Sequence, residues 1–212
     1  MRIRPLPAIF TASALALLTA CASGGSPPPT GAEGEALFAA FSTTWALNLD
    51  ESDTFQQALE EAQGATAPGA AAGGRGGGRG GRRGGAGGGF TDATREGLRS
   101  NMLGVQELGG MASSRLALAV SATSIQVRPD GGIGLDLVPH EPMTRTIGDL
   151  QLSITARWDG REFSVERQVQ EGATLTETYR VSDSGDRLYV ERVIRTRGGP
   201  IIRQTQVFDR AG

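Results

Sequence analysis

The chain has 212 residues and a formal net charge of −2, and its composition excludes several classes of site. All of its basic residues are arginine, 32 residues are glycine, and cysteine and histidine occur once each. A single cysteine excludes an intramolecular disulfide and any zinc site that needs two thiolates, and a single imidazole excludes multi-histidine metal centres. The length allows one ordinary domain with flanking segments, and no pattern in the sequence calls for a cofactor.

The first twenty residues have the pattern of an export signal. Two arginines precede an apolar run over 8–18, which is too short to span a bilayer as a mature helix. The run ends at Leu18-Thr19-Ala20-Cys21, which resembles the lipobox of bacterial lipoproteins. This resemblance implies that Cys21 is the first mature residue, carries acyl chains such as palmitate, and anchors the protein in the membrane.

The residue after Cys21 implies a destination. Ala22 stands where an inner-membrane lipoprotein of the enterobacterial type often carries Asp, so the resemblance implies the outer membrane, with the protein facing the periplasm. The alternative is an ordinary signal peptide followed by an incidental cysteine.

The mature chain divides into four segments of different composition. Residues 21–32 contain Ser-Pro-Pro-Pro and predict an extended tether. Residues 33–64 predict a short helix over 35–41, a strand around Trp45 and a helix from Phe55 with Ser52 or Asp53 as its N-cap, all packing on the main domain. Residues 65–89 are rich in Ala, Gly and Arg and predict a disordered linker, because they bury too little surface to offset chain entropy. Residues 90–212 predict a helix over 92–111 and an antiparallel β domain.

The Gly/Arg part of the linker resembles RNA-binding repeats only in composition. Residues 73–89 contain four arginines but no interleaved aromatic residue, and they follow an export signal. Nucleic-acid binding is therefore disfavoured, while weak contacts with anionic lipid, glycan or the preceding acidic segment stay open.

Turn positions and side-chain alternation over 150–210 predict an antiparallel meander. Turns at Asp159-Gly160, 171–173 and 183–186 bring the apolar faces of successive strands into agreement. The first two turns place Trp158 opposite Arg161 and Arg167 opposite Glu177, and the third places Glu177 opposite Arg192. A last turn near 198–200 brings Gln204 onto the same face.

This apolar face carries an unexpected polar row. The row consists of Arg167, Glu177 and Arg192 and is continued by Gln204. Tyr179 lies on the same face. Because burying one ion alone costs several kcal/mol, the charges should be mutually paired, solvated in a cavity, or bound to an anion. The row is therefore either an internal network that fixes strand register or the polar end of a ligand cavity suited to carboxylate or phosphate, unless the register is wrong or the face is exposed.

Two resemblances bear on the fold. Trp45 near the start, followed by a meander with a polar cluster inside, resembles the lipocalin-type barrel, whose opening strand often carries Gly-x-Trp. The segment Trp45-Ala46-Leu47-Asn48-Leu49 and the C-terminal meander are similar to uncharacterised exported proteins of soil-type bacteria, which implies a shared β fold and no activity. We expect a mainly β fold: an antiparallel meander, lipocalin-like barrel or curved sheet with one or two short helices.

These expectations favour a binding protein over an enzyme. Closed sheets hold apolar ligands inside and orient them with a few polar groups, so we expect an envelope lipoprotein that binds a small amphiphilic or anionic ligand in a β cavity. An envelope interaction or structural protein with a filled core is the alternative. Catalysis such as hydrolysis is disfavoured, because His140 and Glu141 lie in a predicted surface loop and Glu177 between two arginines should have a lowered pKa. The sequence identifies no ligand and no protein partner.

Overall fold

The computed structural model describes residues 25–65, 113–147, 150–169, 173–196 and 199–212. The expected export signal, the acylated Cys21, the Gly/Arg linker and the helix over 92–111 lie outside these ranges. Within them, two helices, α1 (Gly31–Phe41) and α2 (Phe55–Ala65), accompany one antiparallel sheet of ten strands. None of the described helices has the length and apolar character needed to cross a membrane.

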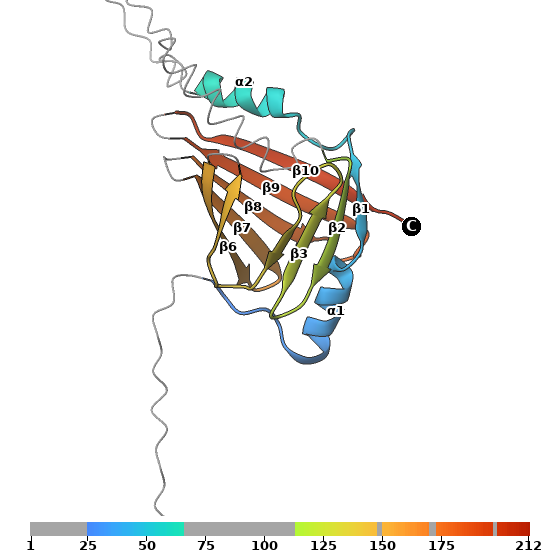
Figure 1. Ribbon diagram of the computed structural model, residues 1–212. Coiled ribbons are helices and arrows are strands. Elements are labelled where there is room, and N and C mark those ends of the chain that lie inside the picture. The colour runs from blue at the N-terminus through green and yellow to red at the C-terminus, as the bar shows by residue number, and fades with distance from the viewer. Residues whose placement is uncertain (1–24, 66–112, 148–149, 170–172, 197–198) are drawn as a thin grey trace, which may run out of the picture.

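The sheet is an up-and-down meander whose first and last strands pair with each other. Its strands are β1 (Thr44–Asn48), β2 (Arg115–Val120), β3 (Ile125–Pro129), β4 (Leu135–Leu137), β5 (Met143–Ile147), β6 (Leu150–Asp159), β7 (Glu162–Val169), β8 (Thr174–Val181), β9 (Arg187–Arg195) and β10 (Ile202–Arg210). They lie in the order β4-β3-β2-β1-β10-β9-β8-β7-β6-β5, so the sheet curls into a nearly closed barrel (Figure 1). The prediction of a mainly β, barrel-like meander with short helices is confirmed.

The barrel opens between β4 and β5, which form the two edges of the described sheet. Arg145 on β5 reaches across this opening, where its Nη1 donates a hydrogen bond of 3.0 Å to the carbonyl of Gly134. The connecting loop is held to the sheet as well, since the backbone N–H of His140 donates to the carbonyl of Ala156 at 2.8 Å. One side chain therefore bridges the opening, and the loop pairs with a carbonyl of β6 beyond the residues that β5 covers.

Figure 1 shows α1 at one end of the barrel, and buried aromatic side chains pack together at this end. Phe41 at the end of α1 is fully buried, and its ring lies 5.2 Å from that of Phe163 and 6.1 Å from that of Trp158. Phe163 in turn stacks on Tyr179 at 4.6 Å. The indole N–H of Trp45 donates to the carbonyl of Phe41 at 3.1 Å, which fixes α1 against β1. This end of the barrel is thus closed by packed rings.

The described chain begins on the outside of this closed end. The carbonyl of Ser26 accepts a hydrogen bond of 3.1 Å from the backbone N–H of Gly160 in the β6–β7 turn. A Cβ atom on Gly25 would lie 2.4 Å from the carbonyl oxygen of Trp158, so the backbone approaches the barrel more closely than a larger residue would allow. The chain that leads into α1 therefore contacts the barrel from Gly25 onward.

Two of the predicted hairpin registers are wrong, each by two residues. Trp158 pairs with Phe163 instead of Arg161, and Arg167 pairs with Leu175 instead of Glu177. The first turn is centred one residue later than predicted, because Asp159 pairs with Glu162 and Gly160 has a left-handed φ of 61°. A shift of two residues keeps every side chain on its face, so the predicted inner face is retained. The register of β8 and β9, with Glu177 opposite Arg192, is confirmed.

The N-cap of α2 is Thr54, so the prediction of Ser52 or Asp53 is wrong. Thr54 Oγ1 accepts from the backbone N–H of Gln57 at 3.2 Å, and Gln57 Oε1 accepts from the backbone N–H of Thr54 at 2.9 Å. This reciprocal pair is a capping box. Ser52 and Asp53 instead bond to β10, where their side chains accept from the backbone N–H groups of Val207 and Thr205 at 2.9 and 2.8 Å.

Truncation of Phe41 tests the aromatic closure. We expect Phe41→Ala to lower the free energy of unfolding by about 3–5 kcal/mol, because the cavity left between rigid rings cannot collapse. Urea denaturation would measure the change. Ile201→Ala, at a side chain 49% exposed, is the matched control and should change stability by less than about 0.5 kcal/mol. Equal effects of the two substitutions would contradict the described packing.

Candidate functional site

The structure brings the predicted polar row together inside the barrel. Its four side chains point inward, and none is more than 5% exposed. They are Arg167 on β7, Glu177 on β8, Arg192 on β9 and Gln204 on β10. Glu177 lies directly opposite Arg192, and Arg192 directly opposite Gln204. The row therefore crosses four neighbouring strands without interruption.

Glu177 holds the row together through two hydrogen bonds and one ion pair. Its Oε1 accepts from Nε of Arg192 at 2.9 Å, and its Oε2 lies 2.6 Å from Nη1 of Arg167. The hydroxyl of Tyr179 donates to the same Oε2 at 3.1 Å. Both arginines are thus fixed in place by one carboxylate.

Burial and charge act on Glu177 in opposite directions. Burial alone would raise the pKa of this carboxyl, but the guanidinium groups of Arg167 and Arg192 outweigh burial and hold its pKa below the ordinary value. Burial, followed by the charge of Glu177, raises the pKa of Tyr179 above its ordinary range. Glu177 is therefore a fixed negative charge at neutral pH, and Tyr179 remains a protonated donor.

The interior carries an excess of positive charge. Among the described residues, the buried charged side chains are those of Arg167, Arg192 and Glu177, which together have a formal charge of +1. Nε of Arg167 is also buried without a hydrogen-bond partner in the described part of the chain. An unpaired buried donor costs about 1–3 kcal/mol, so this position is suited to an added acceptor.

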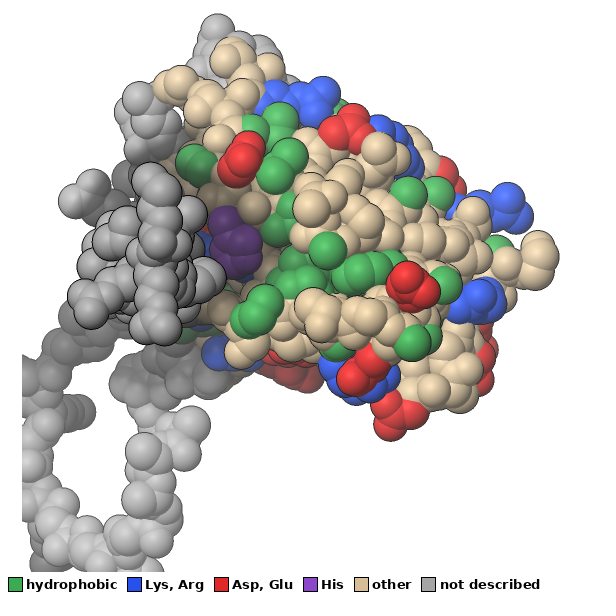
Figure 2. Space-filling view, turned by 90° about the horizontal axis from the view of Figure 1, so that it is seen from below, with side chains coloured by type: hydrophobic (Ala, Val, Ile, Leu, Met, Phe, Trp, Pro, Cys, Tyr) green, Lys and Arg blue, Asp and Glu red, His purple; other side chains and the backbone are tan. Residues whose placement is uncertain are grey.

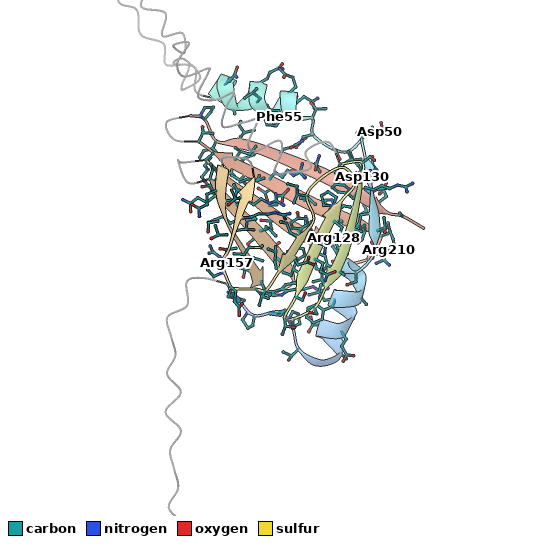
Figure 3. The ribbon with its side chains drawn as sticks, in the orientation of Figure 1. Asp50, Phe55, Arg128, Asp130, Arg157 and Arg210 are labelled. Atoms are coloured by element: carbon teal, nitrogen blue, oxygen red, sulfur yellow. The ribbon has the colours of Figure 1, made fainter. Side chains whose placement is uncertain are left out.

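The polar row ends at a pocket between β1, β10 and the start of α2. The pocket has a volume of about 310 Å³ and is lined by Leu47, Leu49, Ser52, Asp53, Thr54, Phe55, Ser114, Gln204 and Gln206. Figure 3 shows Phe55 at the start of α2, at the end of the barrel opposite α1. Nε2 of Gln204 donates to the carbonyl of Asp53 at 2.9 Å, which joins the row to the wall of the pocket.

Asp130 fixes the chain beside this pocket. Its carboxylate accepts from the hydroxyls of Ser113 and Ser114, each at 2.6 Å, and from the backbone N–H of Arg115 at 3.0 Å. Asp130 is labelled in Figure 3. The hydrogen bonds from Ser113 and Ser114 are the main cause of a pKa of Asp130 lowered to about 2. The carboxylate therefore stays ionised and holds the start of β2, where Ser114 lines the pocket.

Sequence reasoning found the row but missed two residues of the pocket. Gln206, a buried residue of β10, is given no role by the sequence pattern, and Asp53 is predicted from the sequence only as a candidate helix cap. The available signal was that Gln204 and Gln206 alternate with outward-facing residues on a strand whose other inner residues are apolar. Nothing in the sequence placed Asp53 beside them, since 151 residues separate Asp53 from Gln204.

The surface outside this pocket carries an exposed histidine and a groove beside α1. His140 is exposed in the loop before β5 and has a left-handed φ of 68°, and the single histidine is visible at the surface in Figure 2. The described residues contain no group of three or more His, Cys, Asp or Glu placed to hold a metal ion. A larger groove of about 650 Å³ lies outside the barrel between α1 and the β8–β9 turn.

Comparisons with known proteins give distant structural neighbours. No protein-family model matches the chain, and no curated protein matches its sequence. A Schistosoma mansoni fatty acid binding protein in complex with arachidonic acid is 9% identical with a TM-score of 0.43, covering 82% of this chain and 98% of its own. The apo form of a Caenorhabditis elegans lipid binding protein is 10% identical with a TM-score of 0.43, covering 82% and 96%. A secretory abundant heat soluble protein of Ramazzottius varieornatus is 14% identical with a TM-score of 0.36, covering 46% and 69%.

Replacing Glu177 tests the electrostatic role of the row. We expect Glu177→Gln to lower the free energy of unfolding by about 3–5 kcal/mol, because it leaves two buried guanidinium groups without their carboxylate. The measurement is urea denaturation at neutral pH. Glu166→Gln, on the outer face of β7 and 3.9 Å from Arg157, is the matched control and should cost no more than about 1 kcal/mol.

The free energy of unfolding of the wild type and that of Glu177→Gln should also depend differently on pH. The pKa of Glu177 is lower in the folded than in the unfolded state, so its ionised form stabilises the fold. This stabilisation is complete above the ordinary pKa of glutamate and is lost as pH falls through the lower pKa of the folded state. The wild type should therefore lose more stability than Glu177→Gln on acidification below about pH 4.5. Parallel pH curves would contradict an ionised Glu177 in the folded interior.

Proposed function

We propose that the barrel binds a small amphiphile whose anionic group lies against Arg167 and Arg192. The observation that carries this proposal is the buried row with an excess positive charge and an unpaired Nε on Arg167. Guanidinium groups suit carboxylate or phosphate because their planar N–H donors match two oxygen atoms at once. Glu177 orients both arginines in advance, so a ligand would not bear the cost of ordering them.

Apolar residues around the row suit the other end of an amphiphile. On the strands next to β7, Ile154 and Leu175 lie opposite Arg167, and both are almost completely buried. Further along the sheet, Ile194 lies opposite Leu175 and Ile202 opposite Ile194. A polar group at the arginines would therefore be surrounded by hydrocarbon, which is the usual pattern of a small-molecule site.

Another candidate is a non-catalytic envelope interaction or structural protein with a filled interior. The observation that favours it is the pairing of both Glu177 oxygens with arginine inside the chain itself. In that case the row serves to fix strand register, and function lies with a protein partner on the outer surface.

Native mass spectrometry of residues 22–212, which contain every described element, separates these candidates. After incubation with a bacterial lipid extract and purification without detergent, we expect a bound adduct on the wild type. Arg167→Met should reduce the bound fraction at least about tenfold, since a charge-assisted hydrogen bond contributes about 1.5–3 kcal/mol.

Arg203→Met is the control, because Arg203 points outward from β10 with a side chain 62% exposed. It should retain the adduct. Bare wild-type protein after incubation would reject ligand binding and leave the filled-interior candidate. An adduct that survives Arg167→Met would place the ligand away from the row.

We further propose that the protein is an envelope lipoprotein, acylated on Cys21 and held at the outer membrane facing the periplasm. The support is the motif Leu18-Thr19-Ala20-Cys21 at the end of an apolar run. The described chain begins four residues later, at Gly25 beside Trp158. An extended chain of four residues spans at most about 14 Å, so acyl groups on Cys21 would hold the α1 end of the barrel close to the bilayer.

Replacing the cysteine tests the anchor. We expect Cys21→Ala to abolish incorporation of labelled palmitate, because the proposed acyl chains are attached at Cys21. The protein should then leave the membrane fraction, since these chains provide its attachment to the bilayer. Ser23→Ala is the control and should leave labelling unchanged. A wild-type protein whose intact mass shows no acyl group would reject the proposed anchor.

A further inference from the structure

The pocket beside α2 presents hydrogen-bond acceptors that lack donors. Oε1 of Gln204 and Oε1 of Gln206 are buried, and neither has a hydrogen-bond partner among the described residues. Both side chains are 3% exposed and line the pocket. The orientation of Gln204 is set by its Nε2, which donates to the carbonyl of Asp53, so its oxygen is the free end of the amide. Leaving such oxygens unpaired costs free energy, which a donor in the pocket would recover.

Two hydroxyl groups on the pocket wall already donate within the chain. Oγ of Ser52 donates to the carbonyl of Val207, and Oγ1 of Thr54 donates to Oε1 of Gln57 at 2.8 Å. The charged residue of the lining is Asp53, whose Oδ2 accepts from the backbone N–H of Thr205. The wall therefore combines two amide oxygens with one carboxylate, and its formal charge is −1.

Besides Ser114, the rest of the wall is apolar, and the space in the pocket is limited. Leu47, Leu49 and Phe55 line the pocket, and Leu49 is 77% exposed. A volume of about 310 Å³ holds on the order of ten non-hydrogen atoms at about 30 Å³ each. A short alkyl chain would cover Leu49 and remove apolar surface from water.

From these three features we propose that the pocket binds the primary ammonium group of a small alkylamine. The ammonium has three N–H donors and no acceptor, which matches Gln204 Oε1, Gln206 Oε1 and the carboxylate of Asp53. Its alkyl chain packs on Leu47, Leu49 and Phe55. This site is separate from the anionic group proposed for Arg167 and does not depend on it.

Titration of residues 22–212 with n-octylamine tests the site, with 1-octanol and octanoate as probes of equal chain length. Octylamine should bind at least about tenfold more tightly than either, because hydrogen bonds to a charged group are the stronger ones. Gln206→Leu and Asp53→Asn should each weaken octylamine binding about fivefold or more. Side-chain amide signals of Gln204 and Gln206 in NMR spectra of the wild type should shift on titration, which reports contact without any substitution.

One control variant is Gln126→Leu, on the exposed face of β3, which should leave octylamine affinity unchanged. Equal affinities for octylamine and octanol, or amide signals of Gln204 and Gln206 that do not move, would overturn the proposal.

Discussion

The carboxylate of Glu177 between two arginines is the interaction on which the rest of the barrel interior depends. Three buried ionic groups are tolerated there because each guanidinium contacts an oxygen of Glu177 and Tyr179 donates to the same carboxylate. Removing this charge would leave two desolvated cations in a low-dielectric space, whereas keeping it fixes the relative positions of β7, β8 and β9. The same arrangement leaves an excess positive charge, and so the structural network and the proposed anion site are two consequences of one geometry.

The two ends of the barrel have different physical characters. At the α1 end, the rings of Phe41, Trp158 and Phe163 pack against one another. In this cluster of three described side chains, the indole N–H of Trp158 is the polar group without a hydrogen-bond partner. At the α2 end, the polar row reaches a pocket with unpaired amide oxygens on Gln204 and Gln206. Both proposed binding sites therefore include residues outside the aromatic cluster at the α1 end.

Sequence reasoning identified the row because strand alternation has a period of two. The predicted pairing of Arg167 with Glu177 is wrong, yet both side chains lie on the inner face, since a register error of two residues moves side chains along the strand without turning them over. The pocket was not predicted for a different reason. Asp53 reaches Gln204 only through the pairing of a loop near the start of the chain with its last strand.

The sequence by itself determined the alternating faces of the meander, the positions of its turns to within a residue or two, and the presence of charges on an inner face. These properties follow from local spacing, which backbone geometry translates directly into side-chain direction. The tertiary structure decided that β1 lies between β2 and β10, that Glu177 contacts both arginines at once, and that Gln204, Gln206 and Asp53 share one pocket. Such contacts depend on closure of the sheet over long stretches of chain, and local spacing carries no information about which distant strands will meet.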